Sequence, residues 1–356
     1  MFSLRVAEVI KVDSLSQQCE ELLVKLGKDT ARAINYVALT GTASPGERVV
    51  LNTTAVELGL GSGGYHFVYL NLAKIERSIS GDGHLMKLRY TPSQIRTLSV
   101  EEEASPHHLK LKEAVSLEGL VVIAAELHSM LAPAVVTLKQ EKPSARVVYL
   151  MTDGGALPAC FSNTIRNLRQ SGLLEAVITS GHSFGGDLEA VNVYSGLLAA
   201  RHVLKADVAV ACMGPGVAGT STAFGFSGIE MGENINRIHA LEGSAVALPR
   251  LSFSDARARH RGLSHHTLTA LNRVALAAAD LPLPVLPPEQ DSILKDQLQS
   301  AGLCVRHRVV WLDNLSLRHL ADSGIDFSTM GRTLYQDEAF YLAAVAAARH
   351  AAAMLC

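Results

Sequence analysis

The chain has 356 residues, of which 48% are hydrophobic and 19% are charged, and its formal net charge is −2. This length and apolar content are typical of two globular domains with a sizeable core. The near-neutral charge gives no electrostatic case for a nucleic-acid partner, which would require a basic face. The five cysteines are widely spaced and form no CxxC pair, which indicates reduced thiols in the cytoplasm.

The most apolar run of the chain, residues 119–138, does not resemble a membrane span. It contains Glu126 and His128 and is interrupted by Pro133, so a buried strand followed by a helix explains it better. The amino-terminal segment lacks the basic start and long apolar core of a signal peptide. We therefore predict a cytoplasmic protein with no membrane partner.

The first hundred residues predict an all-β domain. Short runs rich in β-branched residues are separated by glycine-containing turns. The runs are Leu4–Val12, Glu21–Leu26, Ala31–Leu39, Arg48–Glu57, Tyr65–Asn71 and His84–Tyr90. Closure into a small barrel would remove exposed strand edges. We predict a barrel-like domain over residues 1–105, ending in the charged, proline-marked linker Glu101–Pro106.

From about residue 117, apolar strand candidates alternate with helical stretches. The strand candidates are Leu120–Ala125, Arg146–Met151, Ala176–Thr179, Ala206–Cys212, Ala245–Phe253 and Cys304–Trp311. The helix candidates are Thr164–Ser171, Leu188–Leu204, His265–Ala279 and Asp291–Ser300, and Pro282–Pro288 reads as a stiff connector. Alternating buried strands and helices are typical of a parallel sheet. We predict a mostly parallel, Rossmann-like three-layer α/β domain over residues 106–356.

The alanine-rich stretch Glu338–Leu355 predicts a final helix. Its small side chains suit close packing, either against the sheet or against a second subunit of a homo-oligomer. Both alternatives are open at this stage.

In an open parallel sheet, ligands bind outside the carboxyl ends of the strands. Five successive strand candidates are followed by glycines or by Asp, His and Ser side chains. The loops begin at Glu126, Thr152, Gly181, Gly214 and Ser254. This pattern predicts one crevice for a small-molecule ligand.

The loop GHSFGGD, residues 181–187, follows a strand candidate and precedes a predicted helix. Glycines around a serine at a strand-to-helix turn are typical of a nucleophile elbow. Ser183 is therefore a candidate nucleophile, with His265 or His266 as base and Asp255 and Asp153 as further catalytic candidates. Alternatively, the glycines only permit close packing, and Ser183 donates a hydrogen bond.

A second glycine-rich loop, GPGVAG at residues 214–219, matches the GxGxxG pattern after a strand. Such a loop cradles a phosphate when a helix begins at its end. No acid follows at the spacing that a dinucleotide requires, so we predict either a purely structural glycine loop or a generic anion site. Its candidate residues, together with those of the first loop, are His182, Gly185, Gly186, Asp187, Gly214, Gly216, Gly219 and Thr220.

Asp255, His260 and His265 are candidate ligands of a divalent metal, although their spacing fits no known ligand motif. His265 and His266 are adjacent, and on one helix they point about 100° apart. We therefore expect at most one of them to share a ligand with His260. An acid–base or anion-binding role is the alternative to a metal.

Several long phrases resemble an uncharacterised bacterial family, domain of unknown function 3866. They are VVLNTTAVELGLGSGGYHFV, GHLMKLRYTP, GHSFGGDLEAVNVYSGLLAA, HRGLSHHT and DFSTMGRT. The resemblance spans nearly the whole chain and implies a shared architecture and a bacterial cytoplasmic setting. It implies no activity and no cofactor.

These observations favour an enzyme, a hydrolase or group transferase, that acts on a small anionic or phosphorylated metabolite. Two alternatives stay open. One is a non-catalytic sensor that binds a nucleotide or metabolite in the same crevice. The other is a metal-dependent hydrolase built on Asp255 and the three histidines.

Overall fold

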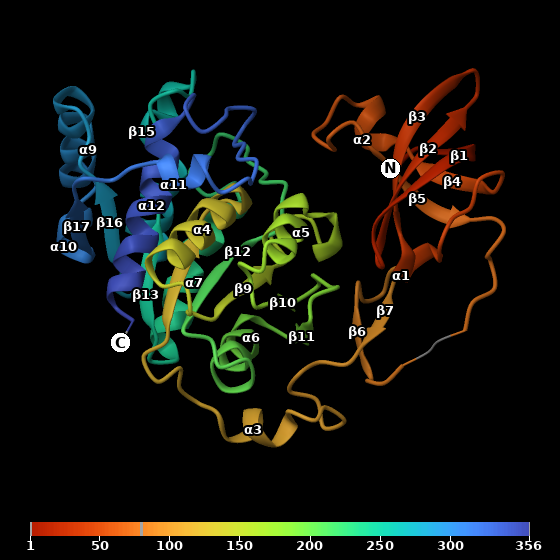
Figure 1. Ribbon diagram of the computed structural model, residues 1–356, viewed down its shortest axis with the longest axis horizontal. Helices are drawn as coiled ribbons and strands as arrows, with labels where there is room; N and C mark the ends of the chain where they lie inside the picture. Colours follow the sequence, from red (N-terminus) through yellow and green to blue (C-terminus); the bar gives the residue numbers. More distant parts are fainter. Residues whose placement is uncertain (1, 79–80, 356) are drawn as a thin grey trace. The chain divides into compact units, whose positions relative to one another are not determined.

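The computed structural model describes residues 2–78 and 81–355 (Figure 1). The chain forms two compact units, one up to Thr97 and the other from Leu98 onward. Ser99 pairs with Glu189, and Glu101 accepts a hydrogen bond from the Val191 amide at 2.9 Å. The segment expected as a linker is thus folded onto the second unit.

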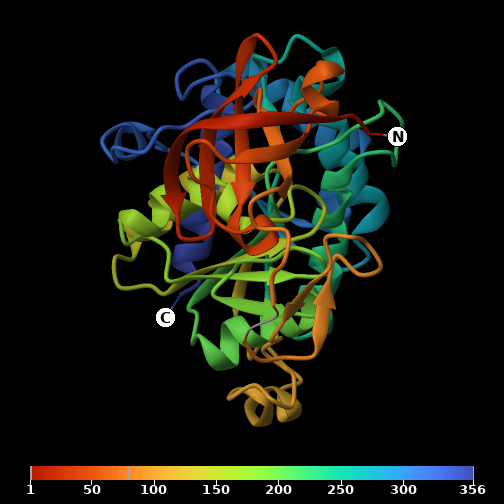
Figure 2. The same ribbon diagram turned by 90° about the vertical axis from the view of Figure 1, so that its right-hand side faces the viewer.

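The first unit is a closed five-stranded barrel with the strand order β1-β2-β3-β5-β4, as predicted (Figure 2). The strands are β1 (Leu4–Ser16), β2 (Cys19–Leu26), β3 (Asp29–Tyr36), β4 (Arg48–Asn52) and β5 (His66–Asn71), with the short helices α1 (Val37–Thr40) and α2 (Thr54–Glu57). Alternate side chains such as Val9, Leu22, Val24 and Leu51 fill the barrel interior. The run predicted at residues 84–90 forms β6 (Leu85–Lys87), which pairs with β7 (Ile95–Thr97) in a separate sheet.

The second unit contains an eight-stranded sheet with the order β11-β10-β9-β12-β8-β13-β16-β17, and every pair is parallel. The strands are β8 (Val121–Ala125), β9 (Val147–Thr152), β10 (Ala176–Ser180), β11 (Leu188–Ala190), β12 (Val208–Met213), β13 (Ser244–Leu248), β16 (Asp280–Pro284) and β17 (Arg308–Leu312). The strands β8, β9, β10 and β12 are fully buried, which explains their continuous apolar sequence. The predicted parallel α/β domain is confirmed.

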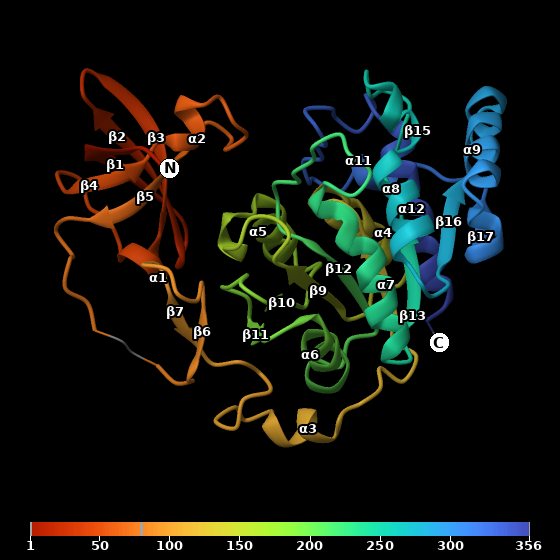
Figure 3. The same cartoon turned by 180° about the vertical axis from the view of Figure 1, so that it is seen from behind.

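Helices cover both faces of this sheet (Figures 1 and 3). One face carries α4 (Leu131–Glu141), α5 (Asn163–Gln170), α11 (Arg318–Ala321) and α12 (Glu338–Ala353), and the other carries α6 (Val193–Leu198), α7 (Glu230–Ala240) and α8 (His265–Thr269). The remaining helices are α3 (His108–Glu113), α9 (Pro288–Ser300) and α10 (Leu303–Arg306). The alanines of α12 are buried against α4 and β16, in agreement with the sheet-packing alternative for this segment.

The strand order identifies the point at which ligands bind in such sheets. Strands β8 and β12 are adjacent in the sheet. From the end of β8 the chain continues to β9, toward the β11 edge of the sheet, whereas from the end of β12 it continues to β13, toward the β17 edge. The connections therefore diverge between the carboxyl ends of β8 and β12, where a crevice forms in doubly wound folds.

Several predicted elements differ from the structure in their bounds or type. Residues 188–190 form the edge strand β11, so the helix expected from Leu188 begins only at Val193. The segment expected as a connector, Pro282–Pro288, begins inside β16. This strand pairs with β13 only at Asp280, so Pro282 and Pro284 need not donate a backbone hydrogen bond to β13. The helix expected over 265–279 ends at Val274, after a π-helical turn that follows α8.

No helix in the described ranges is both long and apolar enough to cross a bilayer.

Candidate functional site

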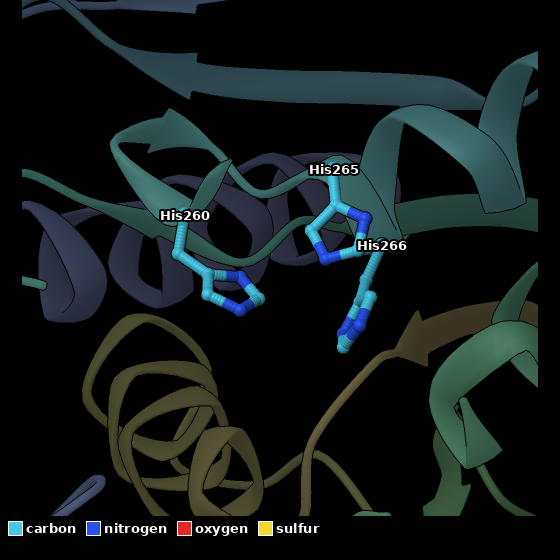
Figure 4. Close-up of side chains that lie close together, drawn as sticks. All are labelled: His260, His265 and His266. Carbon is cyan, nitrogen blue, oxygen red and sulfur yellow. The ribbon is translucent and has the colours of Figure 1, made fainter. Parts of the chain in front are cut away.

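Three histidines converge after β13, close to the carboxyl end of the sheet. One ligand nitrogen from each of His260, His265 and His266 lies within 4.8 Å of the other two (Figure 4). The ring centroids are 4.2 Å apart for His265 and His266, and 5.0 and 5.1 Å apart for the pairs that include His260. Within the described residues, this is the group of side chains best placed to hold a metal ion.

The expectation that His265 and His266 could not both join His260 is wrong. The chain folds back on itself through the short ladder of β14 (Leu251–Ser252) and β15 (Gly262–Leu263), which returns the turn carrying His260 to the start of α8. Two adjacent side chains diverge at Cβ, but their imidazole rings are long enough to converge on a third ring placed opposite them.

Ser264 organises the local structure of the cluster. Its hydroxyl oxygen caps α8 by accepting a hydrogen bond from the His266 amide, and it lies 2.8 Å from His260 Nδ1. In the tautomer in which Nδ1–H of His260 donates to Ser264, Nε2 carries the free lone pair that a metal requires.

Glu126 lies behind His266. Its carboxylate is fully buried at the end of β8, with Oε1 3.5 Å from His266 Nδ1, while Thr267 donates a hydrogen bond to Oε2. Within the described residues, Glu126 Oε1 and His266 Nδ1 are both buried and neither has a hydrogen-bond partner. A carboxylate that accepts from the second nitrogen of a histidine orients the ring and raises its basicity in metal sites.

The environment disfavours the protonated form of two of the histidines. Burial, reinforced by the positive charges of Arg250 and Arg257, lowers the pKa of His260 to about 3. Burial also lowers the pKa of His265, and the charges of His266 and Arg259 act in the same direction. Nε2 of His265 is buried and has no hydrogen-bond partner among the residues that the structure describes. Neutral imidazoles with an unused nitrogen are the form that binds transition metals.

The glycine-rich loop after β12 forms one wall beside the histidines. The ring of Phe226 stacks on His266 with centroids 4.0 Å apart and an interplanar angle of 3°. A Cβ atom on Gly219 would lie 3.5 Å from His266 Nε2. The loop thus contacts the site, but no helix begins at its glycines: Gly219 pairs with Phe226 as a β-bridge, and α7 starts only at Glu230.

The helix terminus expected to supply the field of an anion cradle is therefore absent from this loop. Gly214 has a packing role, because a Cβ atom there would lie 2.4 Å from the Ala156 carbonyl oxygen. Gly216 has φ +103°, a conformation that favours glycine. Thr220 is exposed, and its hydroxyl lies 3.0 Å from that of Thr222.

Asp255 does not join the histidines. Its buried carboxylate accepts hydrogen bonds from Arg257 at 2.8 and 2.9 Å and from Arg250 at 3.0 Å. The hydrogen bonds from Arg257 hold the pKa of Asp255 well below its usual range. Arg332 lies 3.8 Å away and binds Asp337 at 2.9 Å. This ion-pair network satisfies the carboxylate, so the metal-ligand geometry expected for Asp255 is not found.

The strand-to-helix context of a nucleophile elbow is also not found around Ser183. The loop returns to the strand β11 instead of entering a helix, because residues 181–186 reverse the chain. The Ser183 side chain is fully buried and its hydroxyl donates to the Thr152 carbonyl at 2.8 Å. This geometry favours the alternative in which Ser183 links the ends of β9 and β10.

The other candidates from this loop divide between two places. His182 donates its amide to Asp153 at 3.0 Å, and both lie at the carboxyl end of the sheet. Asp187 instead accepts the Val177 amide at 2.8 Å, and its own amide donates to Val177 O. Because β11 runs parallel to β10, the chain must first return toward the amino end of β10 before β11 begins. Asp187 lies on this return, away from the expected crevice at the carboxyl ends of the strands.

Gly185 and Gly186 belong to the same return of the chain. Gly185 has φ +86° and donates its amide to Glu189 at 2.7 Å. A Cβ atom on Gly186 would lie 2.8 Å from the Val177 carbonyl oxygen, so close packing against β10 requires glycine there. Both residues therefore have a conformational role in this structure.

Two acidic residues complete this edge of the sheet and were not chosen from the sequence. The first is Glu126, which directly follows an apolar strand run, and that position was its only signal. The second is Glu230, the first residue of α7, whose carboxylate accepts from the Thr152 hydroxyl. Burial, together with the nearby charge of Asp153, raises the pKa of Glu230 to about 7.

Comparison with known families assigns the chain to one of them. A family profile described as protein of unknown function (DUF3866) matches residues 32–348. The chain belongs to this family. No curated protein matches it.

Proposed function

We propose that this member of the DUF3866 family is a metal-dependent hydrolase, with His260, His265 and His266 as ligands of a divalent transition metal. The observation that carries the proposal is the convergence of three histidine nitrogens within 4.8 Å, with a buried carboxylate behind one of them. Neutral imidazole ligands suit zinc and neighbouring transition metals.

The geometry of the cluster agrees with a catalytic rather than a structural metal site. Three nitrogens at about 2.1 Å from a tetrahedral ion lie about 3.4 Å apart, so modest side-chain rotations would bring the rings into place. Three protein ligands leave one position for water or substrate, whereas structural zinc sites use four. A metal in such a site lowers the pKa of bound water toward neutrality, which is the chemistry of hydrolysis.

The substrate class of this proposal is a small anionic metabolite, reached from the carboxyl end of the sheet. The location is supported by the strand order, since the histidines and Glu126 follow β13 and β8, next to the point where the connections diverge.

Metal titration of the full chain by calorimetry tests the proposal. We expect one Zn²⁺ or Co²⁺ per chain, with Co²⁺ giving the intense visible absorption of a four-coordinate site. His260→Ala and His265→Ala should each abolish or strongly weaken binding. The matched control is His239→Ala, since His239 is an exposed histidine on α7.

Glu126→Gln should lower the metal affinity by about 10- to 100-fold, because it removes the negative charge behind His266. Hydrolysis of p-nitrophenyl phosphate and p-nitrophenyl acetate, with and without metal, gives a first reading of activity. Binding of no metal by the wild-type chain, or equal affinities for His265→Ala and His239→Ala, would refute the proposal.

A further inference from the structure

The charges around the histidine cluster are not balanced. Three arginines in and around the Asp255 network are matched in number by three carboxylates. The arginines are Arg250, Arg257 and Arg332, and the carboxylates are Glu126, Asp255 and Asp337. Arg259 is in excess of this set. Among residues 2–78 and 81–355 it has no ion pair or hydrogen bond through its side chain, and it is exposed.

Arg259 lies at the solvent side of the cluster. It immediately precedes His260 in the 3-10 turn Ala258–His260, and the His260 ring lies 5.0 Å from the ring of His265, the histidine that is only partly buried. Its neighbour Arg261 differs, since that guanidinium lies over the Phe253 ring at 5.8 Å. Arg259 is thus an exposed cation on the turn that carries His260, one of the ligands of the proposed metal.

The loop after β12 supplies a polar segment beside the same histidines. Gly219 lies against the Cε1 and Nε2 edge of His266, where a Cβ atom would be 3.3 and 3.5 Å from these two atoms. The exposed residues Thr220, Ser221 and Thr222 follow directly. Hydroxyl groups and a guanidinium fork are the groups that bind phosphoryl oxygens in proteins.

We propose that Arg259, together with the loop Gly219–Thr222, binds a phosphoryl group of the substrate beside the histidine cluster, so that the substrate is a phosphate monoester; this rests on the metal site proposed above. The excess arginine charge, together with that of a divalent ion, suits a dianion better than a monoanionic carboxylate. In the reaction, water oxygen bonds to phosphorus, the ester P–O bond breaks, and the proton from water passes to the leaving alcohol.

Calorimetric titration with inorganic phosphate tests this inference on the full chain, both zinc-loaded and metal-free. The variants are Arg259→Gln and, as a matched control on the same turn region, Arg261→Gln. We expect Arg259→Gln to weaken phosphate binding by about tenfold or more, because a charge-assisted hydrogen bond is lost. Arg261→Gln should leave the affinity within about twofold. Gly219→Ala should also weaken phosphate binding, since the added methyl group would lie 3.3 Å from His266 Cε1.

Acetate is the second probe and separates phosphoryl from carboxylate recognition. Weaker acetate binding, with little dependence on Arg259, supports the inference. Equal affinities for acetate and phosphate, no phosphate binding by the wild-type chain, or equal effects of the two arginine variants would overturn it. Failure of the wild-type chain to bind metal refutes the proposed function instead, and loss of phosphate binding in metal-free Arg259→Gln would still support the anion site.

Discussion

Replacement of Glu230 by glutamine should stabilise the protein in a pH-dependent way. Glu230 is partly buried at the start of α7, where it accepts a hydrogen bond from Thr152 and lies near Asp153. Glutamine keeps the size of the side chain and can accept the same hydrogen bond. It removes the negative charge that burial disfavours.

The magnitude follows from the pKa of Glu230, which burial raises from 4.5 to about 7. Between these two pH values the folded chain retains a proton that the unfolded chain has lost. The free energy of unfolding therefore decreases as pH rises. The difference of about 2.5 pH units corresponds to about 3 kcal/mol at pH 8 and less than about 1 kcal/mol at pH 5. Glu230→Gln should recover this free energy.

Urea unfolding at pH 5 and at pH 8 measures the effect. We expect the gain in unfolding free energy from Glu230→Gln to be about 2–3 kcal/mol larger at pH 8 than at pH 5. The control is Glu233→Gln on the same helix, where the carboxylate is half exposed and pairs with Arg237 at 2.9 Å. Equal gains at both pH values for Glu230→Gln would show that its burial does not hold the carboxyl group protonated.

Three further predictions follow from the site. Asp255→Ala should destabilise the chain by about 3–5 kcal/mol in chemical unfolding, because it leaves the buried Arg250 unpaired, while the metal stoichiometry stays at one; loss of metal with normal stability would contradict the assigned role. Ser183 should not react with a fluorophosphonate probe, and Ser183→Ala should cost only about 1 kcal/mol, the value of its hydrogen bond to Thr152; covalent labelling lost in the variant would restore the nucleophile hypothesis. Because burial lowers the pKa of His260 to about 3, this ring should stay neutral at pH 6 in an NMR titration of the metal-free chain, and its protonation at that pH would disprove this.

The sequence by itself determined the main architecture, because the underlying patterns are local. Short β-branched runs between glycine turns predicted the barrel, and continuous apolar runs such as Val121–Ala125 predicted strands buried on both faces of a parallel sheet. Because ligands bind at the carboxyl ends of parallel strands, the sequence also predicted a site at the loops that carry Asp153, Gly214 and the histidines.

Local patterns failed where a distant partner decides the outcome. Residues 188–190 carry no strong strand signal, yet they pair with β10 at the sheet edge, and this pairing removes the helix that an elbow at Ser183 would need. The sequence predicted Asp255 as a metal ligand, but in the folded chain its carboxylate pairs with Arg250 and Arg257.

Only the tertiary structure assembled the histidine site. Residues 251–263 fold back onto the start of α8 and so bring His260 close to His265 and His266. The adjacency of these two histidines in the sequence had argued against a common metal ion. Strand β8, more than a hundred residues earlier in the chain, places Glu126 behind His266 because β8 and β13 are neighbours in the sheet. Contacts of this range depend on strand order, which hydrophobic periodicity does not encode.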